Sequence, residues 1–291
     1  MIPHHGDVAS RVPTPPSILQ ALAGCSGRSL KRLEWDGPGA PSPKDLANFL
    51  PSCTQLRNIC MTDCAENEQG EEVPGLAGLT FPHLKVLELT PTSSWQLSTA
   101  STWKLPSLTD VSIMEPLSGE GDVQSEALET FFTAQGEQVL TLAFIIVQNF
   151  DLGPVCNFCP RLQEIVFTLS SGFYPLRGVA VQKAVRRVGI YNLHTYVPWG
   201  QEEAGLRRGN IAELRDGLDM LEKHLSELSS ANFPALKVIR LFHFMPSDAV
   251  NWTKDLDPSR GGWWQGWITK LGSRGISFEG HDGQPIGTLL S

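Results

Sequence analysis

The segment FPHLKVLEL, residues Phe81 to Leu89, returns 152 positions later as FPALKVIRL, residues Phe233 to Leu241. Six of the nine residues are identical, including the Phe-Pro pair and the Leu-Lys-Val core. Two copies this similar indicate that the chain repeats one structural unit.

The two copies reduce to a template, Leu-x-x-Leu-x-Leu, in which Ile, Val, Phe or Met can replace leucine. Successive matches are 26, 28, 24, 31, 23, 23 and 51 residues apart. Most of these steps are close to the period of leucine-rich repeats, about 20–29 residues. The matches begin at Leu30, Leu56, Leu84, Leu108, Val139, Leu162, Val185 and Leu236.

Alternation within the repeat predicts a strand with one buried face. In KVLEL, Leu87 and Leu89 are expected to point inward, and Val86 and Glu88 outward. One unit cannot bury its own apolar face, so neighbouring units must stack. The fold predicted is an α/β leucine-rich-repeat solenoid, a curved parallel sheet with helices and irregular returns on the convex side.

Some of the returns carry helix signals. Thr14 followed by Pro15, and Ser42 followed by Pro43, are each typical of an N-cap and first helical residue. SEALETFFTAQG predicts a helix that ends at Gly136. Residues 93–104 carry few such signals and are expected to be irregular.

Three regions are predicted along the chain. Residues 1–13 are interpreted as a disordered tail, 14–251 as a solenoid of about eight repeats, and 252–291 as a C-terminal cap. The step of 51 residues contains an insertion at 192–230, with a polar loop followed by a helix from Ile211 to Ser229. The cap is expected to hold a Trp-rich helix with Trp264 and Trp267 inward, then an edge strand, because a solenoid end needs a cover.

Composition excludes several classes of partner. The 291 residues carry a net charge of −8 without a basic block, so no nucleic-acid partner is expected. The longest apolar run, Leu142 to Val147, is far shorter than a membrane span of about 20 residues. No secretory signal opens the chain, so the six cysteines are interpreted as reduced thiols of an intracellular protein, in cytoplasm or nucleus.

Motifs for catalysis are scarce. CNFC, Cys156 to Cys159, has the spacing of a redox motif or half of a zinc site. However, Cys159 occupies the repeat position that Phe81 and Phe233 fill, which favours a buried apolar role. His194 and His243 have no recognisable Ser or Asp companions. We therefore expect no enzyme activity, no cofactor and no metal.

FPHLKVLEL, LPSLTDVSI, CPRLQEIVF and FPALKVIRL, with the closing segment RGISFEGHDGQP, resemble the leucine-rich-repeat C-terminal region of F-box proteins from mushroom-forming fungi. This resemblance covers roughly residues 15–287. It implies the substrate-recognition part of a ubiquitin ligase receptor, whose F-box docks on the adaptor of a cullin ligase. Residues 1–29 do not match an F-box, so a cullin-ligase adaptor is an expected partner only if an F-box lies upstream.

The concave face of the sheet is the predicted site for a protein partner, because solenoids bind on such faces. Its charges are acidic in the middle of the chain and basic toward the end. Two alternatives stay open beside the ligase receptor: a free-standing adaptor, and an enzyme that uses Cys or His. The candidate residues are Arg32, Glu34, Glu88, Asp110, Ser112, Glu164, Arg187, Tyr191, Arg240 and Phe242.

Overall fold

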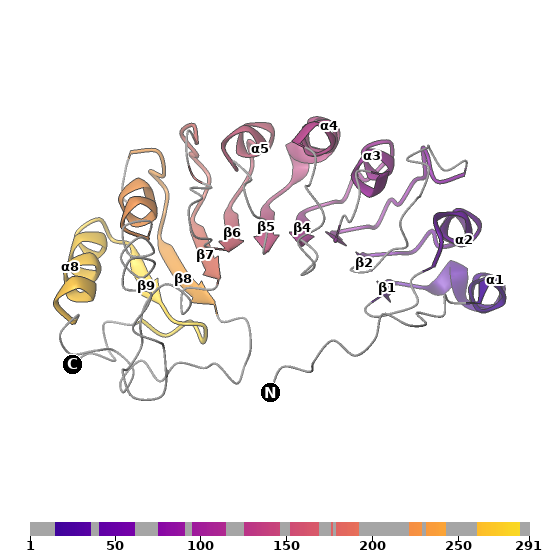
Figure 1. The fold of residues 1–291 in the computed structure, drawn as a ribbon, viewed down its shortest axis with the longest axis horizontal. Coiled ribbons are helices and arrows are strands. Elements are labelled where there is room, and N and C mark those ends of the chain that lie inside the picture. Colours follow the sequence, from indigo (N-terminus) through magenta and orange to yellow (C-terminus); the bar gives the residue numbers. More distant parts are fainter. Residues whose placement is uncertain are drawn as a thin grey trace, which may run out of the picture. The chain divides into compact units, whose positions relative to one another are not determined.

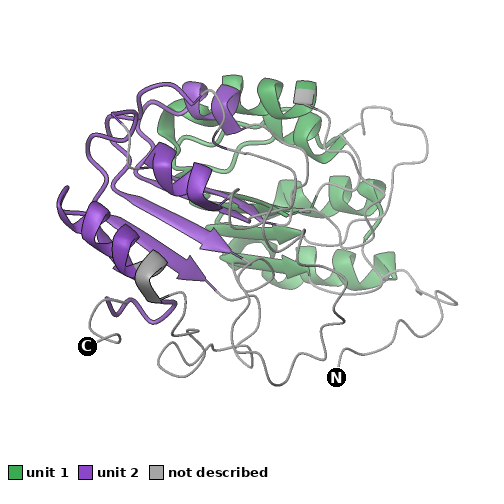
Figure 2. Cartoon of the chain, turned by 60° about the vertical axis from the view of Figure 1, so that its left-hand side comes forward, with its two compact units in different colours: residues 1–139 green, residues 140–291 purple. Residues whose placement is uncertain are grey.

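The structure is a computed structural model, and its contacts divide the chain into two compact units, residues 1–139 and 140–291 (Figure 2). The predicted regions 1–13, 14–251 and 252–291 therefore stay predictions. The residues that the structure describes are 15–35, 41–61, 75–90, 95–114, 125–145, 152–168, 176, 179–191, 221–228, 231–242 and 261–285.

Unit 1 is a parallel sheet with helices on one side (Figure 1). Its strands pair in chain order, β1 with β2, β2 with β3 and β3 with β4. The strands are β1 (Arg32–Trp35), β2 (Asn58–Met61), β3 (Val86–Leu89) and β4 (Asp110–Met114). The helices are α1 (Pro16–Ser26), α2 (Pro43–Phe49), α3 (Trp95–Ser101) and α4 (Ser125–Gln135), with 3-10 turns η1 (Gly27–Ser29), η2 (Leu50–Ser52) and η3 (Gly136–Gln138).

Unit 2 repeats this arrangement, again with parallel pairing between successive strands. Its strands are β5 (Thr141–Ile145), β6 (Glu164–Thr168), β7 (Arg187–Tyr191), β8 (Val238–Phe242) and β9 (Ser277–Glu279). Its labelled helices are α5 (Leu152–Phe158) and α8 (Gly261–Gly272). The described chain is thus an α/β protein with nine strands in parallel pairing.

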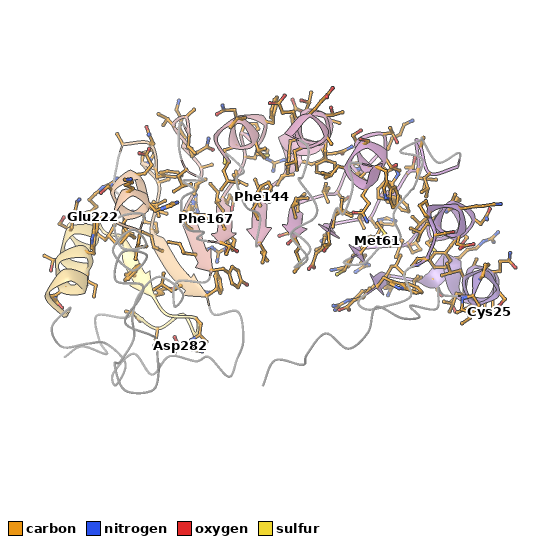
Figure 3. All side chains as sticks on the ribbon, viewed as in Figure 1. Cys25, Met61, Phe144, Phe167, Glu222 and Asp282 are labelled. Atoms are coloured by element: carbon orange, nitrogen blue, oxygen red, sulfur yellow. The ribbon has the colours of Figure 1, made fainter. Side chains whose placement is uncertain are left out.

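The eight predicted strands are all present, and each begins two residues after the first residue of its repeat match. The predicted alternation is also confirmed. Leu87 and Leu89 are fully buried, whereas Val86 and Glu88 are half-buried on the other face. Phe144 and Phe167, labelled in Figure 3, are inward residues of β5 and β6 and are also buried. The core of each unit therefore lies between its strands and its helices.

The helix predictions were right in part. Ser42 caps α2, since its hydroxyl oxygen accepts the backbone N–H of Asp45 at 3.2 Å. At α1 the prediction was one residue early, because Pro15 lies in the cap position with extended backbone and Pro16 begins the helix. The prediction of irregular structure at 93–104 was wrong: α3 forms there, and Trp95, Leu97 and Ala100 are buried, as is Gln96.

Only part of the predicted insertion and cap is described. Of the insertion at 192–230, residues 221–228 are helical, with Leu221, Leu225 and Leu228 buried. The loop at 192–210 lies outside the described residues. Trp267 on α8 is buried, as predicted, and the predicted short strand is present as β9. The side chain of Trp264 lies outside the described residues.

Within the described ranges, the structure contains no helix with both the length and the apolar character of a membrane span.

Candidate interaction surface

Each unit has a sheet face that its helices do not cover, which we call the open face. It is formed by the strand residues whose side chains point away from the core, and most of these are half-buried or exposed, whereas Val166, Thr168 and Gly189 are buried there. In unit 1 the open face comprises Arg32, Glu34, Asn58, Cys60, Val86, Glu88, Asp110, Ser112 and Met114. In unit 2 it comprises Thr141, Ala143, Ile145, Glu164, Val166, Thr168, Arg187, Gly189, Tyr191, Val238, Arg240, Phe242, Ser277 and Glu279.

All five unit 1 candidates lie on its open face. Arg32 and Glu34 form an exposed ion pair along β1, with Nη2 and Oε2 2.6 Å apart. Glu88 lies beside Ser112 in the register of β3 and β4. The carboxylate of Asp110 accepts the Thr109 hydroxyl at 2.6 Å. With three carboxylates and one guanidinium among the candidates, this face is acidic, as the sequence predicts.

The unit 2 candidates form cross-strand pairs, two of which are ionic. Arg187 Nε donates to Glu164 Oε2 at 3.1 Å, between directly opposite residues of β7 and β6. Arg240 donates from both Nε and Nη2 to Glu279 Oε2, at 3.1 and 2.7 Å. The predicted basic end of the surface therefore needs correction: each of these two arginines has a carboxylate partner, which cancels its charge locally.

The third cross-strand pair is aromatic. The rings of Tyr191 and Phe242 are stacked, with centroids 4.8 Å apart and planes inclined by 19°. Both side chains are half-buried. The Phe242 ring reaches over Gly189, where an added Cβ would lie 2.5 Å from Phe242 Cε2 and 3.1 Å from Val166 Cγ2. The missing side chain at Gly189 thus leaves the space that the Phe242 ring occupies.

Sequence reasoning missed three contributors to this surface: Gly189, Val166 and Glu279. Glycine at an outward strand position was the available signal, because it often marks a close approach of another group. Glu279 gave no signal, since its pairing with Arg240 depends on the register of β9 against β8.

The thiols offer no reactive group on the described surface of unit 2. Cys156 and Cys159 are both buried, which confirms the apolar role predicted for Cys159. Burial raises the pKa of the Cys159 thiol to about 12, so it stays protonated at neutral pH. In unit 1, burial likewise raises the pKa of Cys53, although a hydrogen bond from Ser52 opposes the shift. His194 and His243 lie outside the described residues.

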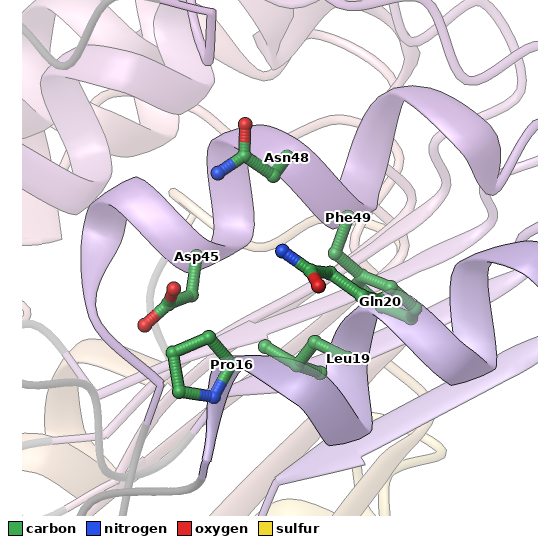
Figure 4. Close-up of a pocket in the computed structure, with 6 residues that line it drawn as sticks. All are labelled: Pro16, Leu19, Gln20, Asp45, Asn48 and Phe49. Atoms are coloured by element: carbon green, nitrogen blue, oxygen red, sulfur yellow. The ribbon is translucent and has the colours of Figure 1, made fainter.

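A hollow lies between α1 and α2 (Figure 4). Pro16, Leu19 and Gln20 of α1 face Asp45, Asn48 and Phe49 of α2 across it. The Asp45 carboxylate is already engaged, because the Ser42 hydroxyl donates to it at 2.6 Å. The hollow is a seam between packed helices, and it shows which side of α1 faces α2.

No protein-family model matches the chain, and no curated protein matches it.

Proposed function

We propose that the protein is a non-enzymatic interaction module that binds a protein partner on its open face. The observation that carries this proposal is the stacked pair of Tyr191 and Phe242, half-exposed between two ion pairs. Aromatic and arginine side chains in such settings are frequent hot spots of protein interfaces. Stacked strand–helix repeats commonly bind partners on the sheet face that their helices leave free.

The type of repeat protein and the kind of partner are proposed from the resemblance described above. The repeat period and motifs support a leucine-rich-repeat protein, and the resemblance supports the substrate-recognition part of an F-box-type ubiquitin ligase receptor. Such a receptor works inside the cell, which agrees with the reduced state of the five cysteines described. A free-standing adaptor is the alternative if no F-box accompanies this region.

The test is affinity capture from cell lysate with the full chain, read by mass spectrometry. A variant with Tyr191→Ala and Phe242→Ala removes the aromatic pair, and one with Lys44→Ala and Glu129→Ala changes exposed residues of α2 and α4 as a matched control. Proteins lost only with the aromatic variant support binding on the open face. Recovery of adaptor and cullin subunits supports the ligase assignment. Identical captures with all three proteins contradict the open-face proposal.

A further inference from the structure

The two ends of the repeat array differ in how the terminal strand and helix are covered. At the C-terminal end, the outer edge of β9 is occupied, since Glu279 forms an antiparallel bridge with Pro285. The exposed positions of α8 include Gln265, Thr269 and Lys270, which are polar. This is the polar cover that the end of a stacked-repeat protein needs for solubility.

The N-terminal end lacks such a cover among the described residues. β1 pairs with β2 on one side only. Two of the three large apolar side chains that are exposed in the described chain lie on α1, Ile18 at 48% and Leu22 at 43% exposed. Leu33, the inward leucine of β1, retains 8% exposure, whereas its neighbours in register, Ile59 and Leu87, have none.

The apolar residues of α1 lie on the side away from α2. Successive residues of a helix are about 100° apart around its axis. Ile18, Leu22 and the exposed Cys25 (labelled in Figure 3) therefore form one stripe, about 150° around the helix from the side that Pro16, Leu19 and Gln20 turn toward α2. α1 and β1 lie at the same end of unit 1 (Figure 1).

The backbone of β1 adds a pattern of its own. Lys31 accepts from Asn58 of β2 with its carbonyl oxygen. Because alternate residues of a strand bond to opposite neighbours, the N–H and C=O groups of Arg32 and Glu34 point to the free side. An unpaired edge of this kind is a template for another strand.

We propose that a second copy of this chain covers the N-terminal end, through two-fold antiparallel pairing of the β1 strands centred on Leu33. This pairing sets Arg32 of each copy opposite Glu34 of the other, as a hydrogen-bonded pair. All four outward backbone groups are then satisfied, and opposite charges face each other across the strands. The self-complementary order Arg-Leu-Glu is what a two-fold interface requires.

The same symmetry covers the stripe on α1. A two-fold axis perpendicular to the sheet keeps the helices of both copies on one side of the joined strands. The two α1 helices then run antiparallel, with the stripes of Ile18 and Leu22 in contact. A four-residue strand pair is marginal alone, so burial of these side chains has to supply much of the affinity.

Sedimentation equilibrium of the full chain tests the proposed dimer. The wild type should approach twice the single-chain mass of 31.9 kDa as its concentration rises. Ile18→Asp with Leu22→Asp should hold it at the single-chain mass. Arg32→Glu should weaken the dimer by about tenfold. The variant places two carboxylates opposite each other, and the two-fold symmetry produces this repulsion with Glu34 at two places in the interface. Val181→Asp, at an exposed residue of unit 2, is the matched control and should leave the dimer intact.

A variant in which the two charges of β1 are exchanged is the decisive test of the proposed strand pairing. Arg32→Glu combined with Glu34→Arg restores opposite charges across the axis and should restore the wild-type dimer. A wild type that stays at the single-chain mass overturns the proposal. So does a dimer that survives the double aspartate variant, or one that the charge exchange fails to rescue. A single-chain protein that is destabilised by the aspartates would assign the stripe to another segment of the same chain instead.

Discussion

The absence of a side chain at Gly189 shapes the open face of unit 2. The position faces outward on β7, where a side chain would be accommodated if the neighbouring strand left room. The Phe242 ring fills that space and also stacks on Tyr191. The position of the ring therefore depends on the missing methyl group at Gly189.

Gly189→Ala tests this dependence. The added Cβ would meet Phe242 at 2.5 Å, so the ring must move, and we expect a loss of about 1–3 kcal/mol in the free energy of unfolding. Urea unfolding measures the loss. Adding Phe242→Leu should recover part of it, because the two sites are coupled.

Gly266→Ala is the matched control. This residue lies inside α8 with no atom within 4 Å of an added Cβ, so alanine should stabilise by about 0.5–1 kcal/mol. Equal effects at the two glycines would contradict the packing described for Gly189.

The Cys159 thiol gives the protein a pH dependence in the alkaline range. Its pKa is raised by burial from 9.0 to about 12, so the folded state holds its proton more tightly than the unfolded chain. Below about pH 9 the thiol is neutral in the folded and the unfolded state, so its contribution to the free energy of unfolding is fully present. Between 9.0 and about 12, ionisation of the unfolded chain lowers the free energy of unfolding by about 1.4 kcal/mol per pH unit.

Cys159→Ala should therefore flatten the decline of stability above pH 9, measured by urea unfolding at a series of pH values. Cys25→Ala, at an exposed thiol, should leave the slope as it is in the wild type. A slope that does not change with Cys159→Ala would contradict the assignment.

At the scale of elements, strands were predictable and helices only partly so. Each strand carries its own alternation and follows a fixed anchor, so Leu84 or Leu162 locates it from local sequence alone. The segment around α3, SSWQLSTAST, has no such local signal. It is helical because Trp95, Leu97 and Ala100 are buried together, and such tertiary packing supplies most helical stability in proteins.

The surface was predictable to a similar degree. The alternation placed all ten candidates on the open faces, because the period of two fixes which side a strand residue takes. Their partners were not predictable, since Arg240 and Glu279 are 39 positions apart and meet only through strand register. That is why the sequence indicated a basic end that the structure shows to be paired.

The N-cap of α2 is the element-scale feature with the clearest energetic consequence. Ser42 exchanges two hydrogen bonds with Asp45, one to its backbone N–H and one to its carboxylate. Ser42→Ala should lower the free energy of unfolding by about 1 kcal/mol. Ser42→Asn should retain most of the stability, because asparagine caps about as well as serine. Thermal unfolding of the three proteins measures the order, and an asparagine variant as unstable as the alanine one would contradict the capping role.

At the scale of the whole molecule, stability should be distributed rather than central. Stacked repeats contact only their neighbours, so a destabilising substitution lowers the stability of adjacent repeats more than that of distant repeats. The division of the chain into units 1 and 2 sharpens this expectation. Each unit has its own strands, helices and buried side chains, which is the structural basis for opening independently.

A pair of buried-charge variants tests whether the units open separately. Leu87→Asp in β3 and Val188→Asp in β7 each introduce an unpaired charge at a fully buried site. Hydrogen exchange read by mass spectrometry should show Leu87→Asp removing protection from β2 to β4 while β6 to β8 keep theirs, and Val188→Asp doing the reverse. Glu88→Ala, one residue from Leu87 but on the open face, should change protection little. If either aspartate exposes both units equally, the protein unfolds as a single cooperative body. If Glu88→Ala acts like Leu87→Asp, the assignment of inward and outward faces in β3 is wrong.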